Sequence, residues 1–201
     1  METDKYQRLS YENQISEGQA MRLCQGSPNT LKFIEEFRVK DDTYLVTKFY
    51  EGGDLINYLN YLGVDKLSES HTYRVFSQIV QGVAEIHKAG IVHRDLKHLN
   101  IFFSDNSDSP NVKIGDFGLA CSLQEDECIK KVAGTIGFMA PEVVSNEVSD
   151  FKSDIWSLGV MLYALLSSGV PFSGRTREDC VKSITESPLT FHNPVWATVS
   201  D

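Results

Sequence analysis

The sequence predicts an α+β fold, because short β-rich runs occur together with long helical patterns. Four β-rich runs form two pairs, and a charged or turn-rich segment separates the members of each pair. The runs are 31–34, 43–47, 101–103 and 112–114. A helical repeat at 68–88 and an apolar stretch at 153–168 predict two long helices. We therefore expect two hairpins packed with mainly helical structure.

Length and composition bound the architecture. With 201 residues, 41% of them hydrophobic, the chain can form one large domain or two small lobes with their own cores. The 28 acidic residues outnumber the 19 lysines and arginines, which gives a formal net charge of −9. This balance argues against a nucleic-acid partner, since such partners are held by basic residues on phosphates.

Cysteine spacing and hydropathy bear on the compartment. The four cysteines show no C-x-x-C spacing, so the sequence suggests neither a zinc site nor a disulfide framework. They are Cys24, Cys121, Cys128 and Cys180. Reduced thiols predict a cytoplasmic protein, with the nucleus as the alternative. The N-terminus has no apolar signal region, and no segment reaches the apolar length of a membrane span.

The first patterned segment predicts a short helix and then a hairpin. Residues 1–14 are polar and unpatterned, but from Ile15 apolar residues recur at helical spacing until the stop signal at 26–29. Gly18 weakens this helix, because glycine costs a helix about 1 kcal/mol relative to alanine. The hairpin that follows should turn at the charged residues 40–42.

The two long helices have different predicted environments. Ser68 can cap the first helix, and Gly90 suits the left-handed residue that follows its end. The apolar residues of this helix should share one face. They are Val75, Phe76, Ile79, Val80, Val83 and Ile86. The helix at 153–168 is apolar nearly all round, which predicts a buried core element, and Asp154 within it must then find hydrogen-bond partners.

The strongest motif is HRDLKHLN at 93–100. Alone, this octet could be a surface loop with chance charges. DFG at 116–118, APE at 140–142 and DIWS at 154–157 follow it in that order. The ordered set resembles a eukaryotic-type protein kinase of the serine/threonine class. The tail from Gly169 onward is similar to the calcium/calmodulin-dependent kinase group.

This resemblance implies a phosphoryl-transfer site that uses ATP and Mg²⁺. Asp95 would accept the proton of an attacking hydroxyl, and Lys97 would direct a positive charge at the transferring phosphoryl group. Asn100 and Asp116 would hold the magnesium ion through oxygen atoms. Thr135 would bond to Asp95 and Lys97, as in the serine/threonine class. The implied partner is a protein substrate with a serine or threonine acceptor.

The resemblance also implies an adenine pocket beside a hinge. The backbone of Lys48 and Tyr50 would bond adenine, and Thr47 would gate the pocket behind it. Phe102 would lie beneath the adenine ring as an apolar floor. Asp54 would meet the ribose hydroxyls, although on its own it fits an ordinary helix N-cap.

Further expectations concern the surroundings of this site. Glu17 would pair with a lysine on an earlier strand, or else be a solvated glutamate near a helix start. Asp154 would bond back toward the catalytic loop at His93. Four residues would stack in a column that aligns the lobes of an active kinase, or be plain core residues. They are Met21, Phe33, His93 and Phe117.

Regulation and substrate choice should depart from the common pattern of the family. Arg94 would usually pair with a phosphate in the activation segment, but the usual phosphosite position holds Lys131. We expect one of the acidic residues 125–127 to supply the negative charge instead. Leu99 occupies a place where related kinases often carry a glutamate, so a preference for basic substrates does not follow.

The resemblance covers a kinase domain that is cut at both ends. Residues 1–47 would be a remnant of the small lobe without glycine-rich loop and lysine strand, 48–54 the hinge, and 55–201 a large lobe without its last helices. This predicts a partial bilobal fold that is a kinase when completed and inactive as this chain alone. The alternative is an inactive pseudokinase or kinase fragment that acts as a binding or scaffold module.

Overall fold

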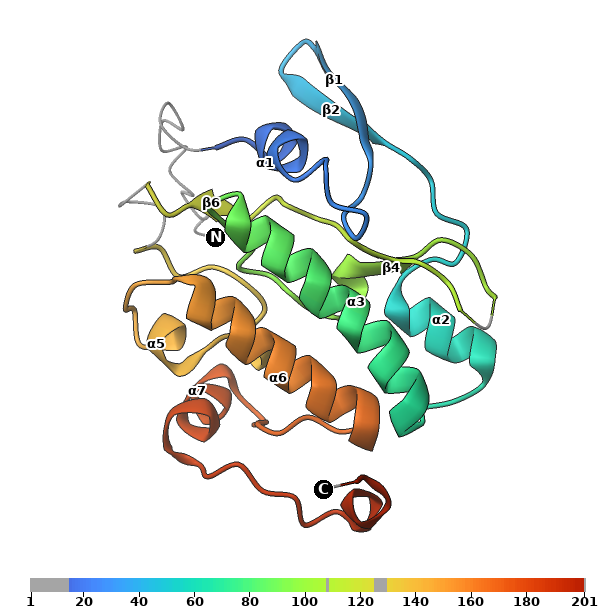
Figure 1. The fold of residues 1–201 in the computed structure, drawn as a ribbon. Coiled ribbons are helices and arrows are strands. Elements are labelled where there is room, and N and C mark those ends of the chain that lie inside the picture. The colour runs from blue at the N-terminus through green and yellow to red at the C-terminus, as the bar shows by residue number, and fades with distance from the viewer. Residues whose placement is uncertain (1–14, 108, 125–129, 201) are drawn as a thin grey trace, which may run out of the picture.

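The computed structural model describes residues 15–107, 109–124 and 130–200. Helices α3 (Glu69–Lys88) and α6 (Phe151–Ser167) pack side by side through its centre. In Figure 1, one hairpin with a short helix lies above this pair, and the C-terminal segments lie below it. The α+β class predicted from the sequence is confirmed.

The upper part consists of α1 (Glu17–Leu23), β1 (Phe33–Val39) and β2 (Asp42–Thr47). The predicted helix and hairpin are confirmed, but the first strand begins at Phe33 rather than Leu31 and continues to Val39. Ser16 and Gln19 form a capping box that starts the helix.

The glycine that weakens α1 is explained by close packing against the hairpin. A Cβ added to Gly18 would lie 2.5 Å from Glu36 Oε2 and 3.1 Å from Leu45 Cδ2. A side chain at this position would therefore displace the carboxylate of Glu36, which pairs with Arg22.

The middle of the chain forms α2 (Leu55–Leu62) and then α3. Ser68 Oγ accepts from the backbone N–H of His71 at the start of α3, and Gly90 is left-handed (φ +78°) after its end, so both predicted boundaries are confirmed. The predicted face is confirmed for Val75, Ile79, Val83 and Ile86, which are all buried.

For Val80, the prediction that it belongs to the buried face of α3 is wrong. Val80 is 43% exposed, because it borders an open groove with Leu162 and Leu166 instead of the hairpin that covers the rest of the face.

Two further strand pairs lie beside α3. The predicted second hairpin is confirmed as β4 (Ile101–Phe103) and β5 (Val112–Ile114), with β4 against α2 and β5 against α3. β3 (Ile91–Val92) pairs with β6 (Cys121–Ser122) just before and after the motif segments. The described residues thus form three two-stranded antiparallel sheets.

The lower part contains α5 (Pro141–Val144), α7 (Arg177–Glu186) and the 3-10 helix η3 (Pro194–Thr198) around α6. The prediction that α6 is a core element is confirmed for Leu158, Met161 and Leu165, which are buried, but not for Ile155, which is 51% exposed. Another side of α6 borders an apolar cavity of about 490 Å³.

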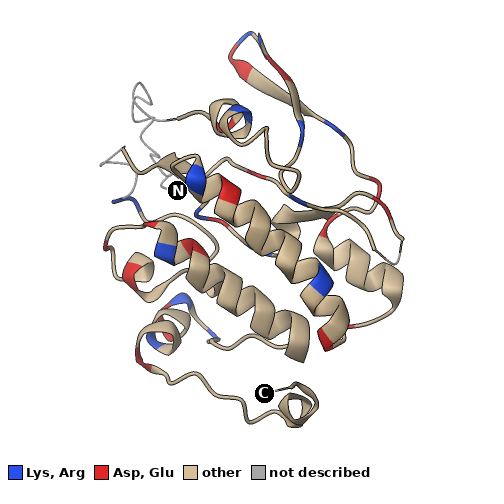
Figure 2. Ribbon diagram, in the orientation of Figure 1, with Lys and Arg blue, Asp and Glu red and all other residues tan. Residues whose placement is uncertain are grey.

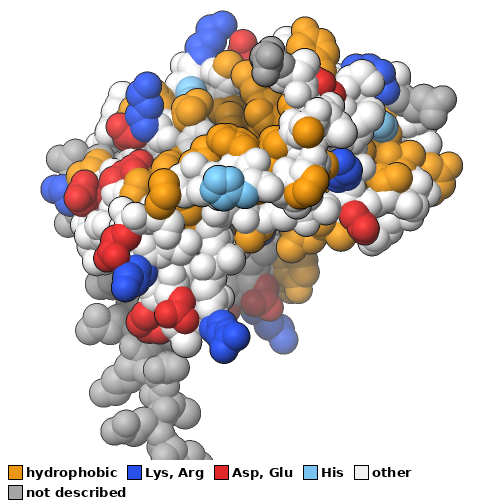
Figure 3. Space-filling model, turned by 90° about the horizontal axis from the view of Figure 1, so that it is seen from below, with side chains coloured by type: hydrophobic (Ala, Val, Ile, Leu, Met, Phe, Trp, Pro, Cys, Tyr) orange, Lys and Arg blue, Asp and Glu red, His pale blue; other side chains and the backbone are white. Residues whose placement is uncertain are grey.

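That cavity opens because the chain covers this side of α6 only loosely. Its lining includes Trp156, Tyr163, Phe191 and Trp196. The view from below shows hydrophobic side chains gathered around a hollow (Figure 3). In the part of the chain that the structure describes, no helix combines the length and apolar character needed to cross a membrane.

Candidate catalytic site

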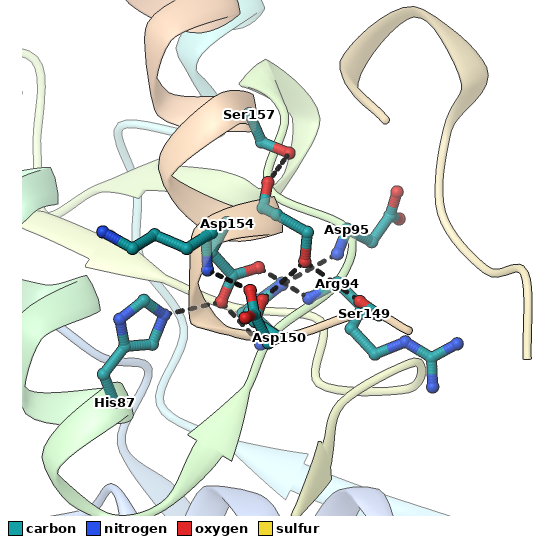
Figure 4. A network of polar contacts seen from close by, with 10 residues as sticks. His87, Arg94, Asp95, Ser149, Asp150, Asp154 and Ser157 are labelled. Carbon is teal, nitrogen blue, oxygen red and sulfur yellow. Dashed lines mark hydrogen bonds and ion pairs between the residues drawn. The ribbon is translucent and has the colours of Figure 1, made fainter. Parts of the chain in front are cut away.

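One buried carboxylate holds the backbone of the segment that carries the HRDLKHLN motif. Asp154, fully buried in the first turn of α6, accepts from the backbone N–H of His93 and of Arg94, each at 2.9 Å. Its Oδ2 atom also lies 2.7 Å from Nε2 of His87, near the end of α3 (Figure 4). The expected bond from Asp154 toward His93 is present, and it fixes the loop between two long helices.

Hydroxyl groups extend this network along the start of α6 (Figure 4). Ser153 Oγ donates to the backbone oxygen of Asp150 (2.6 Å) and lies 3.0 Å from Ser149 Oγ. Ser157 Oγ donates to the backbone oxygen of Phe138 at 2.7 Å, at the end of the 3-10 helix η2 (Ile136–Phe138). The helix that anchors the motif loop therefore also anchors the segment after Thr135.

Asp95, Lys97 and Thr135 form a closed triangle of hydrogen bonds. Thr135 Oγ1 donates to Asp95 Oδ1 at 2.7 Å. Lys97 Nζ donates to Asp95 Oδ2 at 2.6 Å and to Thr135 Oγ1 at 3.0 Å. The structure thus brings together three predicted site residues from two segments 38 residues apart. An oriented carboxylate beside an ammonium group is suited to accept a proton next to transferring negative charge.

Asn100 and Asp116, the two predicted magnesium ligands, lie in segments joined by a backbone hydrogen bond. Asn100, in the 3-10 helix η1 (His98–Asn100), donates through Nδ2 to the backbone oxygen of Asp95 at 2.8 Å. Its own backbone oxygen accepts from Gly115 N at 2.9 Å, so Asp116 follows directly after a bond to Asn100. Asp116 has a left-handed backbone (φ +60°).

This pair fits magnesium rather than a self-sufficient metal cage. Among the described residues, no group of three or more His, Cys, Asp or Glu side chains could hold a metal ion. Magnesium in nucleotide sites takes one or two protein carboxylates and completes its shell with phosphate oxygens and water. One carboxylate and one amide oxygen are consistent with that mode.

Glu17 of α1 reaches the DFG segment. Burial, with the nearby Asp116 charge, raises the pKa of the Glu17 carboxyl, opposed by a hydrogen bond from the backbone of Phe117. Within residues 15–107, 109–124 and 130–200, Glu17 takes part in no ion pair. The structure therefore places it at the site, but does not supply the expected lysine.

The hinge residues leave an edge that suits adenine. Lys48 N donates to the backbone oxygen of Lys32, and Tyr50 O accepts from Gly53 N. Lys48 O and Tyr50 N make no hydrogen bond to any described residue, which leaves one acceptor and one donor for a base. Thr47, at the end of β2, is half-buried.

Asp54 and Phe102 lie next to each other in an isolated β-bridge. Phe102 is half-buried, as an apolar floor requires. Asp54 caps α2, and its two oxygens accept from the backbone N and the side-chain Nδ2 of Asn57. The N-cap interpretation of Asp54 is confirmed, and its contact with the ribose hydroxyls stays a prediction.

The four residues of the predicted column are all buried: Met21, Phe33, His93 and Phe117. The rings of His93 and Phe117 lie 5.0 Å apart, and His93 Nε2 lies 3.1 Å from the backbone oxygen of Gly115. Burial lowers the pKa of His93, despite the nearby carboxylate of Asp154.

The segment that follows the DFG motif contacts the HRDLKHLN loop at Lys131, which occupies the usual phosphosite position. The guanidinium of Arg94 donates to the backbone oxygen of Lys131. The acidic residues 125–127 lie outside the described residues, so their proposed role stays a prediction. Leu99 is 54% exposed next to Asn100.

His87 is the main residue of this site that sequence reasoning missed. It lies 67 residues from Asp154 and carries no motif of its own. A histidine in the last turn of a helix gives only a weak local signal, since it fits the helix dipole equally well.

Comparison with known proteins gives consistent matches. A family model described as "Protein kinase domain" matches residues 1–201. The chain is 35% identical over 173 residues to "Calcium-dependent protein kinase 5" of Plasmodium berghei, which covers 86% of this chain and 30% of that protein. It is 32% identical over 192 residues to "CDPK-related protein kinase" of Daucus carota, covering 96% and 32%.

A third relative is "Calcium and calcium/calmodulin-dependent serine/threonine-protein kinase" of Oryza sativa subsp. japonica. It is 35% identical over 173 residues, which are 86% of this chain and 33% of that protein. The chain thus spans about a third of the length of the relatives it matches.

Proposed function

The chain belongs to the protein kinase family, and from this premise we propose that it transfers the γ-phosphate of ATP to serine or threonine hydroxyls of a protein substrate. The single observation that carries the proposal is the triangle of Asp95, Lys97 and Thr135. A scaffold has no physical need for a carboxylate, an ammonium group and a hydroxyl locked together at one point.

Each member of the triangle has a distinct part in the transfer. Asp95 accepts the proton of the attacking hydroxyl, which is general-base help. Lys97 stabilises negative charge on the transferring phosphoryl group. Thr135 orients both, and it joins the motif loop to the activation segment on which a substrate would lie.

Asn100 and Asp116 would hold magnesium, which when bound neutralises charge on the phosphates. On the nucleotide side, Lys48 O would accept from adenine and Tyr50 N would donate to it, over the ring of Phe102. Asp54 would meet the ribose hydroxyls, because each of its oxygens that accepts from Asn57 keeps a further lone pair.

The test is phosphate transfer from radiolabelled Mg-ATP to a generic basic protein by the purified chain and its Asp95→Asn variant. The variant should lose about 10²–10⁴-fold in rate, because it removes the general base. Asp65→Asn is the matched control, since Asp65 is exposed and outside the site. Measurable transfer at equal rates by Asp95→Asn and wild type would refute the role of Asp95, and no transfer by either would refute kinase activity of this chain by itself.

One observation favours a second function, that of a nucleotide-binding module without turnover. Glu17 is desolvated beside Asp116, and no lysine of the described residues neutralises it. Phosphoryl transfer in kinases depends on such a lysine–glutamate pair. A chain that shows no transfer, yet melts at higher temperature with Mg-ATP in a manner abolished by Asp116→Asn, would establish this second function instead.

A further inference from the structure

A further cleft borders the hinge, and none of the predicted catalytic residues lines it. It has a volume of about 500 Å³ and is lined by the loop after α1, by hinge residues and by the β4–β5 hairpin. Its lining includes Lys32, Lys48 and Lys113, and no aspartate or glutamate of the described residues. It shares Lys48 and Tyr50 with the proposed adenine edge, but none of the catalytic triangle.

A buried aromatic ring forms the fixed floor of this cleft. Tyr50 is only 8% exposed, and its hydroxyl accepts from the backbone N–H of Lys32 at 3.3 Å. The Nζ atoms of Lys48 and Lys113 lie 5.6 and 5.8 Å from the centre of the ring. Lys113 Nζ also donates to the backbone oxygen of Pro28. These contacts hold two ammonium groups near one ring.

The two ammonium groups repel each other, and no carboxylate of the described residues pairs with either. Burial and the neighbouring charge of Lys48 lower the pKa of Lys113. In the described part of the chain, none of the three cleft lysines forms an ion pair. Charged residues of both signs are scattered over most of the ribbon (Figure 2), and the chain carries a formal net charge of −9. Uncompensated cations in a concave site of an acidic protein are an arrangement that an anion would stabilise.

We infer that this cleft docks an acidic segment of a partner protein, whose carboxylates pair with Lys48 and Lys113. The cleft volume lies within the range of about 300–1,000 Å³ that is typical of ligand pockets, more than one small ion needs. The side chains of Gln25 and Asn111 in the lining can bond an extended peptide backbone. The net negative charge of the chain disfavours a nucleic acid as the occupant.

The test measures binding of fluorescein-labelled hexaglutamate to the purified chain at low salt by fluorescence anisotropy. It needs no ATP and no turnover, so its result is independent of the proposed function. Lys48→Gln with Lys113→Gln should weaken binding about tenfold, since two partly exposed ion pairs are lost. The matched control is Lys152→Gln with Lys182→Gln, which removes the same charge from exposed positions on α6 and α7. The control should bind as wild type does.

Lys113→Arg keeps the positive charge and should retain most of the binding. Such a result would show that weaker binding in the glutamine variants comes from the lost charge and not from misfolding. Binding should also weaken as salt rises, because exposed charges are screened. Equal weakening in both double variants would overturn the inference. Equal binding of labelled hexaglutamine would also overturn the inference, because that peptide carries no carboxylates. Full displacement of the peptide by inorganic phosphate, at the concentration at which phosphate itself binds, would likewise overturn it and would indicate a simple anion site.

Discussion

The two longer hairpins of the molecule differ in how deeply their apolar side chains are buried. In β4–β5, the side chains of Ile101, Phe103, Val112 and Ile114 are fully buried, because α2 and α3 pack against the strands. In β1–β2, apolar side chains remain 43–55% exposed, although α1 packs on β1. They are Ile34, Phe37, Val39 and Tyr44. Strand pairing alone therefore does not create a core, and the stability of this chain should reside on the side of β4–β5.

The largest effect on stability is expected at Asp154, the buried carboxylate between α3 and α6. Asp154→Ala should lower the free energy of unfolding by about 3–5 kcal/mol, because two buried backbone donors and the half-buried His87 ring lose their acceptor. The control is Asp150→Ala, which removes an exposed N-cap side chain of the same helix and should cost about 1 kcal/mol. Urea denaturation followed by circular dichroism measures both. Similar losses in the two variants would mean that the buried network adds no stability.

A matched pair of aromatic residues tests the two hairpins directly. Phe103 is fully buried and stacks on Tyr58 at 4.2 Å, whereas Phe37 is 43% exposed and stacks on Tyr44 at 5.3 Å. Phe103→Ala should cost about 3 kcal/mol through lost burial and a cavity. Phe37→Ala should cost less than about 1 kcal/mol, which is roughly the value of an exposed aromatic pair. If thermal melts show equal losses, the hairpins contribute alike and the contrast fails.

The smallest effect concerns pH. Burial lowers the pKa of His93 in the folded state below its unfolded value of about 6.5. Above pH 6.5 the ring is neutral in both states, so its contribution is constant. As pH falls below 6.5, the unfolded chain takes up a proton that the folded chain refuses, and the free energy of unfolding decreases. The β1–β2 hairpin contains no histidine, so this acid sensitivity belongs to the catalytic side.

Urea titrations between pH 5 and 8 measure this slope. His93→Gln should flatten the acid limb but not abolish it, because burial also lowers the pKa of His98. An unchanged slope would show that His93 is protonated alike in both states.

Local signals in the sequence predicted the elements, while contacts between distant segments decided the rest. Ser68 and Gly90 bounded α3 correctly because caps depend on a few neighbouring residues. The exposure of Val80 and Ile155 could not be predicted in this way, since it depends on which segments cover α3 and α6.

The same distinction holds for the candidate site. Motif spacing identified the residues that form the triangle, because their chemistry requires those types in that order. The contacts of His87 with Asp154 and of Lys113 with Lys48 join elements far apart in the chain, and no local pattern marks them.

The left-handed backbone at Arg94 (φ +68°) and Asp116 (φ +60°) lowers stability at two residues whose side chains the site uses. For residues other than glycine, this conformation costs about 1–2 kcal/mol of stability. Glycine at either position would relieve that cost and remove a group that the site uses. A library of variants screened for heat resistance alone should therefore accumulate glycine at 94 and 116, and one screened for phosphate transfer should retain the native pair. These two positions mark where selection for function holds the fold below the stability that it could reach.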